Sequence, residues 1–143
     1  MKPPKVIAGI LAMSALTGIS CVPPRETPGQ VARFREIVIH GVKASFTEDH
    51  FTLFQIPARA ESSMAALQLH ALLAEQRPGG EVIVVGSIDS RLGAKVLARA
   101  LDGAPSLDLH GIRILFVGDS RDQKTIQSKV AGTGAAFAFA AFK

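Results

Sequence analysis

The stretch that decides the fold is EVIVVGSIDS, residues 81–90. Val82 to Val85 form a continuous run of branched apolar residues, which is typical of a strand buried on both faces. Gly86 ends the run, and polar residues able to cap a helix follow it. A helical pattern then extends from Ser90 to Leu101, with apolar side chains on one face. A strand that leads through a glycine into a helix indicates an α/β fold.

The same order of residues recurs about thirty positions later. Ile112 to Val117 is a second apolar strand, Gly118 closes it, and Asp119 or Ser120 can cap a helix over 121–131. Two such units predict parallel strands joined by a right-handed crossover. We therefore expect an α/β fold, with α+β as the alternative, in which helices pack mainly on one face of a small mixed sheet.

The other expected elements lie on either side of these units. Residues 36–42 and 51–56 are rich in β-branched and aromatic residues, so we expect two strands and a hairpin with a long loop. Residues 59–76 predict a helix, which Pro78-Gly79-Gly80 ends. Residues 135–142 alternate between small and aromatic side chains, which predicts a last strand.

The N-terminus has the layout of a secretory signal. Lys2 and Lys5 form a positive region, Val6 to Leu16 is uncharged and mainly apolar, and small residues precede Cys21. The apolar run is shorter than the ~20 residues that a membrane-spanning helix needs. The formal charge of +4 falls to +2 without Lys2 and Lys5, so it does not indicate a nucleic-acid binder.

Cys21 is the chain's single cysteine, which excludes an intrachain disulfide. The segment Gly18-Ile19-Ser20-Cys21 resembles the lipobox of bacterial lipoproteins. That resemblance implies cleavage before Cys21, acylation of Cys21, and sorting to the outer membrane because Val22 follows. We expect a signal peptide over 1–20, a lipidated cysteine and Pro-rich tether over 21–30, and a periplasmic domain over 31–143. An ordinary cleaved signal and an uncleaved anchor are the alternatives.

Candidate chemistry centres on the ends of the two apolar strands. Asp89, Asp119 and Asp122 could gather there and hold a divalent ion or share a proton, but helix capping explains the same residues. Gly86 and Gly118 could admit a phosphate, although no dinucleotide or P-loop pattern is present. The four histidines have no metal-ligand spacing, and no nucleophile motif occurs. We therefore expect no cofactor, no metal and no enzymatic activity.

The order of elements from Phe51 to Gly118 resembles the peptidoglycan-associated OmpA-like domain. Gly86-Ser87-Ile88-Asp89 stands where that family has Gly-His-Thr-Asp, and Arg99 lies in the following helix. The resemblance implies that Asp89 and Arg99 contact a cell-wall ligand, although the histidine and threonine of the motif are replaced.

From these sequence features we expect one of two functions. The first is a structural lipoprotein of the outer membrane that contacts protein partners in an envelope assembly, such as a secretion or conjugation system. Its expected contact surfaces are the tether and the hairpin over 43–54. The alternative is a peptidoglycan-binding lipoprotein that uses Asp89 and Arg99.

Overall fold

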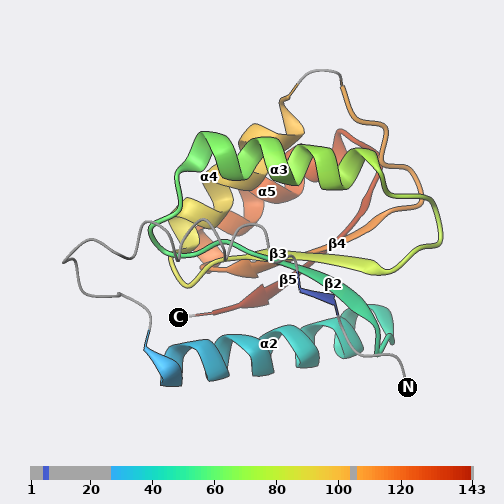
Figure 1. Ribbon diagram of the computed structural model, residues 1–143. Helices are drawn as coiled ribbons and strands as arrows, with labels where there is room; N and C mark the ends of the chain where they lie inside the picture. Colours follow the sequence, from blue (N-terminus) through green and yellow to red (C-terminus); the bar gives the residue numbers. More distant parts are fainter. Residues whose placement is uncertain (1–4, 7–26, 104–105, 143) are drawn as a thin grey trace.

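The computed structural model describes residues 5–6, 27–103 and 106–142 (Figure 1). Cys21 and most of the expected signal and tether lie outside this part of the chain. The helices are α2 (Pro28–Phe46), α3 (Ser62–Ala74), α4 (Ser90–Leu101) and α5 (Ser120–Ala131). The strands are β1 (Lys5–Val6), β2 (Phe51–Gln55), β3 (Val82–Gly86), β4 (Arg113–Gly118) and β5 (Ala136–Ala141).

The sheet has the order β1-β2-β3-β4-β5, and every neighbouring pair is parallel. Val84 lies beside Leu53 on one side and Leu115 on the other, so β3 is central. The apolar runs of β3 and β4 are buried along their length because helices cover both faces. The predicted α/β fold is confirmed, and its described sheet is parallel where we expected a mixed one.

The expected hairpin between residues 36–42 and 51–56 is wrong, because the first of these segments belongs to α2. Thr27 and Gln30 form a capping box at the start of that helix, with Pro28 in its first turn. Phe34, Val38 and Val42 repeat every four residues and are buried on one face. The capping box and this spacing outweigh the strand preference of the β-branched residues. The helix therefore begins inside the segment that we expected to be tether.

The helices lie on two faces of the sheet (Figure 1). α3, α4 and α5 cover one face, where the core contains Phe54, Ile83 and Phe116 among others. α2 covers the opposite face, where Phe34 packs with Val84 and Leu115. Among the residues that the structure describes, the buried residues of both clusters lie between Phe34 and Phe142.

The short strand β1 lies at the edge of the described sheet, parallel to β2. Lys5 lies beside Thr52 and Val6 beside Leu53 at the edge of β2. α2 follows β1 in the chain but lies on the face opposite to α3, α4 and α5. β1 contributes two residues to that edge, whereas the other strands have five or six.

Candidate functional site

The carboxyl ends of β3 and β4 bring together several polar residues that the sequence singled out. The Ser90 hydroxyl accepts a hydrogen bond from the Asp119 backbone N–H at 2.6 Å and donates one to Asp122 Oδ2 at 2.9 Å. Ser90 therefore joins the start of α4 to the start of α5. The buried Ser87 hydroxyl accepts from the Asp89 backbone N–H at 3.1 Å.

The aspartates at this edge act as helix caps. Asp89 Oδ1 accepts from the Leu92 backbone N–H at 3.2 Å, and Asp119 Oδ1 accepts from the Arg121 backbone N–H at 2.9 Å. These bonds satisfy N–H groups that the first turn of a helix leaves without partners. Within the described residues, no three His, Cys, Asp or Glu side chains are grouped to hold a metal ion. The geometry favours capping over an ion site.

Gly86 is required by packing. A Cβ at this position would lie 2.7 Å from the Val117 carbonyl oxygen and 2.9 Å from Cζ of Phe34. The space beside Gly86 on the α2 face is therefore occupied by the ring of Phe34, which is fully buried. The glycine lets α2 approach the sheet closely.

Asp89 and Arg99 do not converge on one ligand position. Asp89 caps the start of α4, and Arg99 lies in its last turn. Ten residues of helix separate them by about 15 Å along the axis. The guanidinium of Arg99 donates instead to the hydroxyls of Ser62 and Ser63 at 3.2 and 3.0 Å.

Arg99 borders a small pocket of about 300 Å³ beside α3. Leu67, His70 and Gly103 are among its lining residues. At the start of α3, the carboxylate of Glu61 accepts hydrogen bonds from the backbone N–H groups of Ser63 and Met64. These bonds hold the pKa of Glu61 below its ordinary value. Glu61 therefore caps the start of α3, next to the pocket that Arg99 borders.

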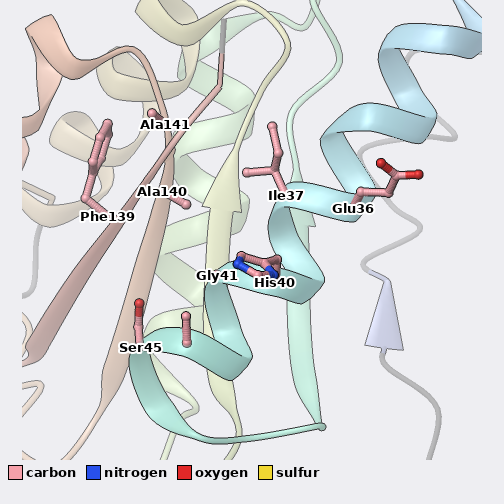
Figure 2. Close-up of a pocket in the computed structure, with 9 residues that line it drawn as sticks. Glu36, Ile37, His40, Gly41, Ser45, Phe139, Ala140 and Ala141 are labelled. Atoms are coloured by element: carbon pink, nitrogen blue, oxygen red, sulfur yellow. The ribbon is translucent and has the colours of Figure 1, made fainter.

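A larger groove of about 560 Å³ lies between α2 and β5. Figure 2 shows Ile37, His40 and Ser45 on α2 and, from β5, Phe139 and Ala140. Sequence reasoning missed this groove because residues 36–42 were interpreted as a strand. The helical spacing of Glu36, His40 and Ala44, which line it, was the signal that could have shown one face of a helix.

The expected contact surface over 43–54 is the end of α2, a turn and β2. Thr47 adopts a left-handed conformation with φ of 54° and ends the helix. Arg113 forms an ion pair with Glu48 at 3.2 Å and lies over the ring of Phe46. Contacts with β4 thus hold this surface against the sheet.

Within the described ranges, no helix combines the length and apolar character that crossing a bilayer requires. Comparisons with protein-family models, with curated proteins and with solved structures found no match to this chain.

Proposed function

We propose that this protein is a lipoprotein, anchored by acylated Cys21 to the periplasmic face of the outer membrane. Its α/β domain serves as a structural and interaction component of an envelope assembly, such as a secretion or conjugation system. The proposal rests on the signal-like N-terminus and the lipobox-like residues before Cys21.

The position of β1 is the structural observation that most supports removal of the first 20 residues. β1 contributes only two residues, and these lie at the edge of the sheet. Both core clusters lie within residues 34–142. Cleavage before Cys21 would therefore remove no residue of either described cluster and would leave the four parallel strands β2 to β5.

The anchor is tested by labelling cells that express the full chain with an alkyne analogue of palmitate. We expect label on the wild-type protein and none on Cys21→Ser, because the chain has no other thiol. Ser20→Ala is the matched control, since it keeps a small residue before the cleavage point and should retain the label. Equal labelling of the wild type and Cys21→Ser would refute acylation at this position.

The interaction role is tested by cross-linking the acylated protein in intact membranes and purifying it. Recovery of a defined envelope partner would support the role, whereas recovery of this chain with no other envelope protein would contradict it. The separation of Asp89 from Arg99 leaves the peptidoglycan alternative supported by the resemblance alone.

A pull-down on purified peptidoglycan tests that alternative. Asp89→Asn is the informative variant, because asparagine preserves the helix cap while removing the charge. Retention of the wild type and loss of Asp89→Asn would favour the cell-wall function. Failure of the wild type to bind would exclude it.

A further inference from the structure

The outer side of α3 is uncharged along its whole length. The helix has the sequence SSMAALQLHALLA, which contains no Asp, Glu, Lys or Arg. Met64 and Leu67 are 43% and 67% exposed, and Ala71 is exposed one turn further on. A helix that covers a sheet normally carries charged residues on its outer side, and a helix that is apolar on every side is normally buried. The outer side of α3 therefore has the composition of a covered surface.

α4 packs beside α3 and borders this apolar side with cations (Figure 1). Its outward side carries one exposed basic residue in each turn: Arg91, Lys95 and Arg99. Within the described residues, none of these three pairs with a carboxylate. Asp102 binds Lys129 at 2.8 Å, so that pair is neutral. Asp89 and Glu61 bind backbone N–H groups at the starts of α4 and α3, where the positive helix ends offset their charge.

Arg99 is held in position to bind a further carboxylate. Its Nη1 donates to the hydroxyls of Ser62 and Ser63, which fixes the guanidinium at the edge of the pocket of about 300 Å³. Its Nε and Nη2 N–H groups make no hydrogen bond within the described part of the chain. A guanidinium can bind a carboxylate through two parallel N–H groups. Arg99 therefore offers an open anion-binding edge next to Leu67, which lines the same pocket.

We propose that the α3–α4 surface, formed by Met64, Leu67, Ala71, Lys95 and Arg99, binds an amphipathic helix of a partner protein whose apolar side is bordered by acidic residues. The apolar side chains of that helix pack on α3, whose exposed residues have the three- and four-residue spacing of helix-on-helix contacts. Its carboxylates pair with the two cations of α4. This inference rests on the interaction role proposed above and names the chemistry of the partner.

The anchor proposed at Cys21 favours a protein over a bilayer on this surface. Cys21 lies six residues before Thr27, so the chain can separate the two by at most about 21 Å. α2 begins at Pro28, on the face of the sheet opposite to α3 and α4 (Figure 1). The outer side of α3 lies about 25 Å from the axis of α2, because the sheet and a helix about 10–12 Å across intervene. The bilayer that holds the anchor would therefore lie nearer to α2, which leaves the α3–α4 surface to a protein.

The surface is tested with two fluorescent synthetic peptides, using the full chain carrying Cys21→Ser so that acylation plays no part. Both peptides form amphipathic helices with the same leucines, and the borders of the apolar side carry glutamates in one and lysines in the other. Fluorescence anisotropy should show that the glutamate peptide binds about tenfold more tightly, since the lysines would meet like charges. Leu67→Ser should weaken this binding, because it removes apolar contact area at an exposed position.

Arg99→Gln should also weaken binding of the glutamate peptide. Arg33→Gln is the matched control, because it removes the same charge from an exposed position on α2 and should leave the affinity unchanged. Lys95→Glu adds a variant whose side chain makes no bond within the described residues, so it leaves the start of α3 undisturbed. It should weaken binding of the glutamate peptide and strengthen binding of the lysine peptide.

Equal affinity for the two peptides would overturn the proposal, as would equal losses in Arg99→Gln and Arg33→Gln. Binding of the Cys21→Ser chain to anionic phospholipid vesicles that Leu67→Ser abolishes would assign the surface to a bilayer instead. Self-association that Leu67→Ser abolishes in sedimentation equilibrium would assign it to a second copy. Recovery of an envelope partner by cross-linking, together with no peptide preference, would keep the interaction role and refute this surface, so the two failures are distinguishable.

Discussion

Replacing Gly86 with alanine should destabilise the domain by about 1–2 kcal/mol. A Cβ at this position would lie 2.7 Å from the Val117 carbonyl oxygen and 2.9 Å from Cζ of Phe34. Both distances are below 3.0 Å, which real Cβ contacts essentially never show, so neighbouring atoms must shift. Neither neighbour can yield easily, because one is backbone and Phe34 is fully buried with its ring 5.4 Å from that of Phe142.

The size of the effect follows from two opposing contributions. Overpacking a close-packed core costs about 1–3 kcal/mol. Gly86 does not have a positive φ, so alanine also restricts the unfolded chain and returns ~0.4–1 kcal/mol. The steric cost therefore exceeds the entropic gain. For a domain of this size, the net loss corresponds to a fall in Tm of roughly 4–8 °C.

Urea unfolding of residues 21–143 carrying Cys21→Ser measures this difference. Gly132→Ala is the matched control, because the atom nearest its Cβ is 3.5 Å away and its φ of −64° suits alanine. The control should be unchanged or slightly more stable. Our account of Gly86 would be refuted if Gly86→Ala proved as stable as the wild type with the same m-value.

Three other substitutions test the same framework. Phe34→Ala should cost ~3–5 kcal/mol in urea unfolding and should reduce the additional cost of Gly86→Ala, whereas additive costs would show that the two residues do not interact. Ser90→Ala removes the hydroxyl that joins α4 to α5 and should cost ~1–3 kcal/mol, while Ser128→Ala on the exposed side of α5 should cost little; equal effects would contradict this role. Backbone hydrogen bonds lower the pKa of Glu61, so its stabilising contribution is complete above the ordinary Glu pKa and is lost as the pH falls through the lowered one. Wild type should therefore exceed Glu61→Gln in stability near neutral pH but not at about pH 2, and a difference that persists in acid would argue against this capping role.

Much of the fold could be predicted because its signals are local. The apolar runs that became β3 and β4, and the helix Ser90–Leu101, lie within one or two residues of their predicted bounds. Turn glycines and capping aspartates next to a hydrophobic pattern act over a few residues. Their effect can therefore be inferred without knowing what the element packs against.

The first helix was predicted wrongly because its residues carry conflicting signals. Ile37, Val38 and Ile39 favour a strand, and the helix cap at Thr27 lies ten positions before the start of that run. Burial of Val38 against the sheet and exposure of Ile39 (56%) resolved the conflict, since a helix of this length gains most of its stability from tertiary packing.

The candidate sites also include features that neighbouring residues determine and features that depend on tertiary packing. The capping role of Asp89 was among the interpretations that its position after β3 allowed, and the structure places its carboxylate on the backbone of α4. The separation of Asp89 from Arg99 follows from the helix that joins them, whereas the groove between α2 and β5 depends on how elements remote in the chain are arranged.

The sequence by itself thus determined the α/β class, the two strand–glycine–helix units and the expectation of an anchor at Cys21. Only the tertiary structure decided that α2 is a helix on the second face, that Gly86 makes room for Phe34, and that β5 is an edge strand of the described sheet. The physical reason is that propensity, turns and caps act between neighbours in the chain. Burial and strand pairing instead join residues that only folding brings together.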